Sequence, residues 1–283
     1  MLKIINLCSV LVILFTINCK SIEIMEKEKK IDGKLSYIDA GRGAKTIVFL
    51  HGAFMNKEIW VPQIETLKKS YRVIAVDLPG HGNSDVKDNE VSIQDFGKKI
   101  SELLESLKAN NVILVGHSIG ADVCLEIYSN YKEDIIGFVA VDYFKNIGQS
   151  LPKSEVDKII DQMNSNYPAS LQYYVENNLV TKDTSLALKR KIENNFINSN
   201  KKFGIELNKK VFEYSEMESE NLKKINSKVY FINVDYFPTD EKTLEKKLKD
   251  NFEFVSIHGT SHYPMLENPE VFNKLLEEII NKI

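Results

Sequence analysis

The chain has 283 residues, of which 43% are hydrophobic and 27% are charged, a composition ordinary for a globular protein with a sizeable core. The formal net charge of −3 offers no basic surface to a phosphate backbone, which argues against a nucleic-acid partner. The length fits one large α/β domain or two small ones, so the order of the predicted elements has to decide between them.

Residues 1–19 form an apolar leader whose single charge, Lys3, precedes a run too short for an ordinary membrane-spanning helix. The leader ends at Cys19, and we expect the polar stretch over 20–30 to be a linker. This arrangement resembles a bacterial lipoprotein signal. The resemblance implies export, lipidation of Cys19 and anchoring at the periplasmic or surface side of a bacterial membrane. A plain secretory signal and an uncleaved anchor are the alternatives.

Strands and helices are predicted to alternate up to residue 142. Continuous β-branched and apolar runs indicate buried strands, and apolar residues at helical spacing indicate helices. In chain order, the sequence predicts strands over 34–41 and 46–52, a helix over 57–70, a strand over 71–77, a helix over 92–111, a strand over 112–116, a helix over 118–130 and a strand over 135–142. Such alternation is typical of crossover units around a parallel sheet that is buried on both faces.

The alternation stops over 143–226, where the patterns are helical and no strand is indicated. It resumes with strands over 228–235 and 252–259, a helix over 243–250 between them, and a last helix from Asn268. The sequence therefore predicts one α/β domain, formed by residues 31–142 and 227–283. Residues 143–226 are predicted to be a helical insertion into that domain.

The stretch Gly116-His117-Ser118-Ile119-Gly120 lies between a predicted strand and a predicted helix. A serine hydroxyl becomes a useful nucleophile only when a base removes its proton and donors await the resulting oxyanion. A very tight strand-to-helix turn exposes the serine and aims the next backbone N–H at the same space, and it requires small residues two positions before and after. We therefore predict that Ser118 is a nucleophile.

Four motifs together resemble the α/β-hydrolase superfamily: FLHGAF, VIAVDLPGHGNSD, LVGHSIG and GTSHYPMLENPE, in this order along the chain. The resemblance implies the α/β-hydrolase fold, a mostly parallel central sheet flanked by helices, with the insertion over 143–226 as a lid. It also implies a Ser-His-Asp triad and no cofactor. Paired cysteines and His-x-x-His spacing are absent from the sequence, so we expect no metal either.

The resemblance also implies roles for other residues. His262, in the loop after the last predicted strand, would be the base that activates Ser118. The backbone N–H groups of Ala53 and Ile119 would form the oxyanion hole. His117 is expected to point away from the site. The residues expected to line the substrate pocket are Phe54, Met55, Tyr143, Phe144, Tyr173 and Tyr174.

The acid of the triad is the least clear residue of the predicted site. Asp235, after the strand over 228–235, is followed closely by a proline, as in the superfamily, and we favour it. Asp142, after the strand over 135–142, is the alternative acid, and Asp240 is a third candidate. Whichever carboxylate serves would orient the imidazole of His262 and stabilise its charged form.

We therefore expect a hydrolase that cleaves a carboxylic ester or a related acyl compound through an acyl-enzyme on Ser118. The expected partner is a small acyl substrate. An acyltransferase or a lyase with the same fold is one alternative, since one fold hosts many activities. A non-catalytic, surface-tethered binding protein is another, supported by the irregular surroundings of Asp235.

Overall fold

A computed structural model describes residues 29–31, 35–130 and 132–283. The predicted leader, with Cys19, and nearly all of the predicted linker lie outside the described residues. Within the described part of the chain, no helix combines the length and the apolar character needed to cross a membrane.

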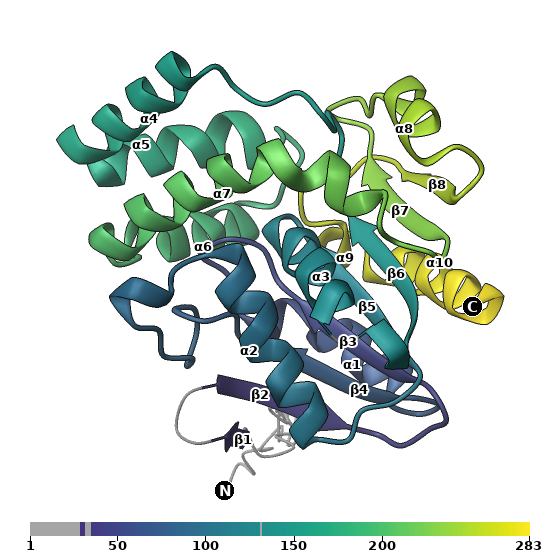
Figure 1. The fold of residues 1–283 in the computed structure, drawn as a ribbon. Coiled ribbons are helices and arrows are strands. Elements are labelled where there is room, and N and C mark those ends of the chain that lie inside the picture. The colour runs from purple at the N-terminus through teal and green to yellow at the C-terminus, as the bar shows by residue number, and fades with distance from the viewer. Residues whose placement is uncertain (1–28, 32–34, 131) are drawn as a thin grey trace, which may run out of the picture.

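The core is an eight-stranded sheet with the strand order β1-β2-β4-β3-β5-β6-β7-β8 (Figure 1). The pairs β1–β2 and β2–β4 are antiparallel, and every other pair is parallel. The strands are β1 (Lys29–Ile31), β2 (Leu35–Ala40), β3 (Thr46–Leu50), β4 (Arg72–Val76), β5 (Val112–His117), β6 (Ile135–Val141), β7 (Val229–Val234) and β8 (Phe252–Ile257). Because the parallel strands run the same way, the loops that follow them meet at one edge of the sheet.

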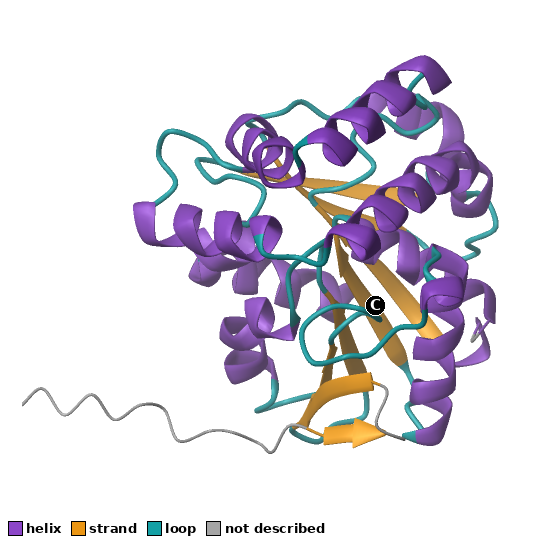
Figure 2. Cartoon of the chain, turned by 90° about the vertical axis from the view of Figure 1, so that its left-hand side faces the viewer, coloured by secondary structure: helices purple, strands orange, loops and turns teal. Residues whose placement is uncertain are grey.

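Helices cover both faces of this sheet, as the continuous apolar runs of the inner strands require. In Figure 1, α2 and α3 lie over the near face, whereas α1 and α10 pack together on the far face. The helices of the core are α1 (Val61–Leu67), α2 (Ile93–Ser106), α3 (Ile119–Asn130), α8 (Glu241–Leu248), α9 (Pro264–Glu267) and α10 (Pro269–Lys282). Short 3₁₀ turns occur at Lys57–Trp60, Asp88–Glu90 and Lys132–Asp134. The side view in Figure 2 shows the strands between these two helical layers.

Two helix starts follow the predicted local chemistry. The side chain of Ser92 accepts a hydrogen bond from the Asp95 N–H at 3.0 Å and caps α2. Asn268 caps α10 in the same way, with Pro269 at the first helical position. The short helix α9 was not expected from the sequence, which predicted a loop there.

Residues 143–226 contain the remaining helices: α4 (Lys153–Ser165), α5 (Tyr167–Tyr174), a π-helical turn (Val175–Leu179), α6 (Leu186–Ile197) and α7 (Lys201–Leu222). We call this segment the helical insertion. It connects β6 to β7 and lies beyond the carboxyl ends of the strands (Figure 1). The insertion is therefore placed where it covers the loops that follow the parallel strands.

The insertion docks on the core partly through buried acids. The hydroxyl of Tyr143 donates to Asp122 Oδ2 of α3 at 2.7 Å and lies 3.4 Å from Glu218 Oε1 of α7. Burial and the neighbouring Glu218 raise the pKa of Asp122 well above its usual value. Burial also raises the pKa of Glu218 to about 7. These raised pKa values favour protonation of the buried carboxyls, Asp122 and Glu218, where α3 meets α7.

Glu218→Gln tests the charge of this junction. The pKa of Glu218 is raised in the folded state, so folding takes up protons, and stability is lost as the pH rises from about 4.5 through about 7. The glutamine side chain of the variant cannot ionise, so the variant does not lose stability in this way. We expect the melting temperature of the variant to exceed that of wild type by a few °C (~2–6 °C) at pH 8 and by about nothing at pH 5.

Glu216→Gln, on the exposed side of the same helix, is the matched control, for which we expect no pH-dependent difference. Thermal melts at the two pH values measure both variants. A gain for Glu218→Gln that is equally large at pH 5 would show that ionisation of the buried Glu218 carboxyl is not its source.

Candidate active site

The turn between β5 and α3 holds Ser118 in a left-handed backbone conformation, with a φ of 53°. A Cβ on Gly116 would lie 2.5 Å from the carbonyl carbon of Gly120, and a Cβ on Gly120 would lie 2.6 Å from the carbonyl oxygen of Leu50. Neither site has room for a side chain, since both contacts involve backbone atoms. The N–H of Ser118 donates to the Val141 carbonyl at 3.2 Å, which ties the turn to β6.

His262 lies in the loop between β8 and α9, and its ring contacts a buried carboxylate. The ring Nδ1 lies 2.6 Å from Asp142 Oδ2. Asp142 directly follows β6, and its side chain is 1% exposed. Since a carboxylate only accepts, the His262 Nδ1 carries the proton and Nε2 is the nitrogen with a free lone pair in the neutral ring.

The second oxygen of Asp142 is also occupied. Oδ1 accepts from the Val234 N–H at 3.0 Å and lies 2.7 Å from Lys145 Nζ. Burial by itself would raise the pKa of Asp142, but the hydrogen bond with His262 and the charge of Lys145 outweigh burial. The pKa of Asp142 is therefore lowered, which keeps this carboxyl ionised.

Lys145 makes several contacts besides its ion pair. Its Nζ donates to the carbonyl oxygens of Val234 at 3.2 Å and Phe237 at 3.0 Å, and it lies 4.6 Å from the centre of the Tyr236 ring. The side chain is 10% exposed. This lysine therefore holds Asp142 against the loop that follows β7.

The structure does not bring Asp235, the favoured acid, to His262. Asp235 Oδ2 lies 2.9 Å from His258 Nδ1, and the side chains of Asp235 and His258 are 48% and 74% exposed. Asp240 caps α8, where its Oδ1 accepts from the Thr243 N–H at 3.1 Å. The expected contact between Asp235 and His262 is wrong, because the carboxylate of Asp235 faces solvent whereas Asp142 enters the buried space beside the ring.

His117 does not point away from the site, contrary to expectation. Its side chain is fully buried, and its Nε2–H donates to the backbone carbonyl of His262 at 2.8 Å. The two rings lie 4.4 Å apart between centres. Burial and the neighbouring His262 hold the pKa of His117 well below its usual value, so the ring is neutral. His117 is therefore a packing and hydrogen-bonding support for His262, and no pattern in the sequence pointed to it.

Ser118 and His262 line one cavity of about 480 Å³, a volume typical of small-molecule sites. Ala53 and Ile119, whose N–H groups were expected to bind an oxyanion, line it as well. Ile119 is the first residue of α3, so its N–H has no partner within the helix and lies at the positive end of the helix dipole.

The walls of this cavity differ in part from those expected. Phe54, Tyr173 and Tyr174 line it, as predicted. Met55 and Phe144 are buried elsewhere, Tyr143 is half-buried elsewhere, and none of the three lines it. The remaining walls come mainly from the helical insertion, whose contribution could not be assigned residue by residue from the sequence.

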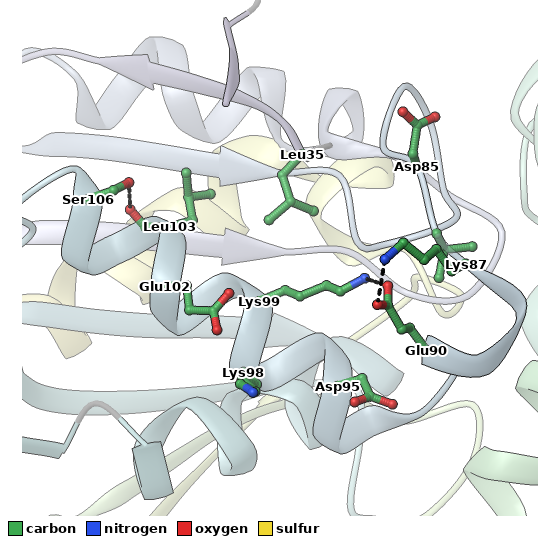
Figure 3. A pocket seen from close by; sticks show the side chains of 11 residues that line it. Leu35, Asp85, Lys87, Glu90, Asp95, Lys98, Lys99, Glu102, Leu103 and Ser106 are labelled. Carbon is green, nitrogen blue, oxygen red and sulfur yellow. Dashed lines mark hydrogen bonds and ion pairs between the residues drawn. The ribbon is translucent and has the colours of Figure 1, made fainter. Parts of the chain in front are cut away.

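A second hollow, of about 460 Å³, lies between β2, the loop over 85–90 and α2. Three of its charged side chains, Lys87, Glu90 and Lys99, pair with one another, as Figure 3 shows. Glu90 lies 2.5 Å from Lys99 Nζ and 3.3 Å from Lys87 Nζ. This hollow contains no serine–histidine pair, so the cavity at Ser118 is the stronger candidate.

Within the described ranges, no group of three or more His, Cys, Asp or Glu residues could hold a metal ion.

Comparison with known proteins gives relatives of several activities. A hydrolase of (E)-2-((N-methylformamido)methylene)succinate from Acinetobacter baylyi is 36% identical over 105 residues, which cover 37% of this chain and 39% of the relative. A 2-(acetamidomethylene)succinate hydrolase from Mesorhizobium japonicum is 32% identical over 34% of this chain and 35% of the relative. These alignments span well under half of either relative.

The similarity to solved structures extends over a larger share of the chain than these alignments do. An esterase from Exiguobacterium antarcticum has a TM-score of 0.76 and 20% identity, over 90% of this chain and 98% of the esterase. This similarity concerns the fold. A family model described as the alpha/beta hydrolase fold matches residues 45–217, more than half of the chain. The chain therefore belongs to the α/β-hydrolase fold family.

Proposed function

We propose that the protein is a serine hydrolase that cleaves a carboxylic ester or a related acyl compound through an acyl-enzyme on Ser118. The observation that carries the proposal is the 2.6 Å contact between His262 Nδ1 and Asp142 Oδ2, beside a serine held in a tight turn at the same cavity. Its relatives include hydrolases, which supports the same reaction class. Their particular substrates are not carried over, because the alignments cover less than half of each relative.

In the proposed first step, Ser118 Oγ attacks the acyl carbon while His262 Nε2 takes the hydroxyl proton. The same proton then goes to the leaving alcohol, and an acyl ester on Ser118 remains. Water, deprotonated by His262, attacks this ester, and the proton on His262 passes to Ser118 Oγ as the acid is released. Asp142 stays ionised throughout, in keeping with its lowered pKa, and it stabilises the imidazolium that forms in each step.

The oxyanion of each tetrahedral intermediate would be stabilised by backbone donors. The N–H of Ile119 at the start of α3 is one, and the N–H of Ala53 in the loop after β3 is the other. The tight contacts of Gly116 and Gly120 hold this turn in place before the substrate arrives. Fixed donors of this kind contribute roughly 3–4 kcal/mol each to transition-state stabilisation.

Three substitutions test the assignment of the triad. Ser118→Ala is expected to abolish turnover of p-nitrophenyl esters and labelling by a fluorophosphonate. Asp142→Asn is expected to lower kcat/KM by about 10²–10⁴-fold, because the amide can donate to His262 Nδ1 and so favours the ring tautomer with no lone pair at Nε2. Asparagine also tolerates the left-handed backbone at this position, where φ is 47°.

Asp235→Asn is the matched control, and we expect its kcat/KM to stay within about twofold of wild type. The exposed pair that Asp235 makes with His258 contributes little to stability, so the control should fold normally. Equal losses for the Asp142 and Asp235 variants would contradict the proposed triad.

Lys145→Met tests the ion pair behind the triad. The pKa of Asp142 is lowered in the folded state, so its stabilising contribution is present above the usual aspartate pKa and lost as the pH falls through the folded value. Without the ammonium group, the free energy of unfolding at pH 7 should drop by about 1–3 kcal/mol. The deficit should shrink as the pH falls below the usual aspartate pKa and through the lowered folded value, where the carboxyl becomes protonated.

Lys158→Met is the control for Lys145→Met, since it removes an exposed pair with Glu155 at 2.7 Å. We expect it to change the free energy of unfolding by less than about 0.5 kcal/mol at either pH. Urea titrations of the three proteins at pH 7 and pH 2.5 provide the comparison. A deficit for Lys145→Met that is the same at both pH values would rule out the ion pair as its origin.

A further inference from the structure

We propose that the cavity at Ser118 selects substrates whose acyl and alcohol parts are uncharged, and that it discriminates against esters carrying a carboxylate. This inference rests on the proposed function and names the substrate class of the same site. It depends on what lines the cavity, on which hydrogen-bond donors are already engaged, and on the charges around the triad.

The lining of the cavity is mostly apolar and carries no acidic or basic side chain apart from two histidines. None of the described residues that line it is a lysine, arginine, aspartate or glutamate. Side chains such as Phe54, Phe196, Leu207, Val211 and Phe212 form its walls. A carboxylate that entered this space would leave water without meeting an opposite charge, and such a transfer is strongly unfavourable. An alkyl or aryl group would instead gain from leaving water.

The polar side chains of the walls are neutral, and three of them already use a donor within the protein. Asn208 Nδ2 donates to the Gly204 carbonyl at 2.8 Å, and Asn178 Nδ2 donates to the Tyr174 carbonyl at 3.1 Å. The Ser170 hydroxyl donates to the Asn166 carbonyl at 2.9 Å. The two amide oxygens are acceptors and would repel a carboxylate rather than bind it.

The charges that surround the triad are no more favourable to an anion. Asp142 is ionised beside His262, and the carboxylate of Glu267 accepts from the Ser261 N–H in the same loop. Lys145 is the cation that contacts the triad, and its ammonium group is held by Asp142 Oδ1 and two backbone carbonyls. Lys145 does not line the cavity. It therefore neutralises Asp142 and is not available to a substrate.

The exposed part of the lining is uncharged as well. Leu151, Tyr173 and Tyr174 are 48%, 68% and 47% exposed to solvent, and the exposed Gln162 and Asn178 are polar but carry no charge. An entering substrate therefore meets no charged side chain among the described residues that line the cavity.

A pair of esters of equal acyl length tests the inference on the full-length protein. In p-nitrophenyl pentanoate the acyl chain ends in a methyl group, and in mono-p-nitrophenyl glutarate it ends in a carboxylate. The leaving group is identical, so the ratio of the two kcat/KM values reports on the acyl group. We expect the pentanoate to be favoured by about a hundredfold or more at pH 7.5.

The outcomes separate this inference from the proposed function. A ratio near one, or one that favours the glutarate, overturns the inference while turnover itself still supports the serine hydrolase. No turnover of either ester, together with no fluorophosphonate labelling of Ser118, overturns the proposed function and this inference with it. Turnover of the pentanoate alone, lost in Ser118→Ala, supports both.

Asn208→Lys adds a cation to the wall and is expected to raise the relative kcat/KM for the glutarate at least tenfold. Asn198→Lys is its matched control. Asn198 makes the same kind of bond, from Nδ2 to the carbonyl four residues earlier at 2.9 Å, but it is exposed at the end of α6 and does not line the cavity. The pentanoate activity reports whether each variant folds. An active Asn208→Lys with an unchanged ratio would overturn the inference.

Discussion

The arrangement of the site depends on one buried carboxylate. Asp142 contacts His262 Nδ1, Lys145 Nζ and the Val234 N–H, so it joins the loops that follow β6, β7 and β8. A carboxylate with no such partners would not remain ionised in this space. Its backbone is also left-handed, which few residues other than Asn, Asp and Gly accept readily. Charge and backbone conformation thus favour aspartate at this position.

The parallel sheet brings these loops together, and the close contacts around the nucleophile turn fix the remaining element. Gly120 lies against the carbonyl of Leu50, at the end of β3, and this contact places α3 directly above the neighbouring strand. His117 then links the end of β5 to the loop of His262 through the bond to its carbonyl. His262, the proposed base, is therefore held on both sides, by a carboxylate at Nδ1 and by the His117 ring at its backbone carbonyl.

The sequence was most informative where local chemistry decides structure. Buried strands and the turn at Ser118 depend on residues close together in the chain, and the strands were predicted at the right places. The proposed acid was harder to predict. Asp142 and Asp235 both follow parallel strands, so both can approach the same edge of the sheet. Which of the two contacts His262 depends on the direction of each side chain and on His258, which pairs with Asp235 instead. Sequence spacing reveals neither. The same holds for Met55, a pocket candidate that packs into the core instead.

His262 is also hydrogen-bonded to the helical insertion that covers it. The His262 N–H donates to the Leu179 carbonyl at 3.2 Å, and the Tyr236 hydroxyl donates to the Asn178 carbonyl at 2.7 Å. A hinge-like swing of the whole insertion would break these bonds and displace the imidazole. A motion of the insertion that keeps both bonds is therefore confined to atoms other than these two carbonyls, among them the exposed rings of Tyr173 and Tyr174 at the cavity. Exposed side chains of this kind change rotamer in picoseconds to nanoseconds, much faster than whole domains move.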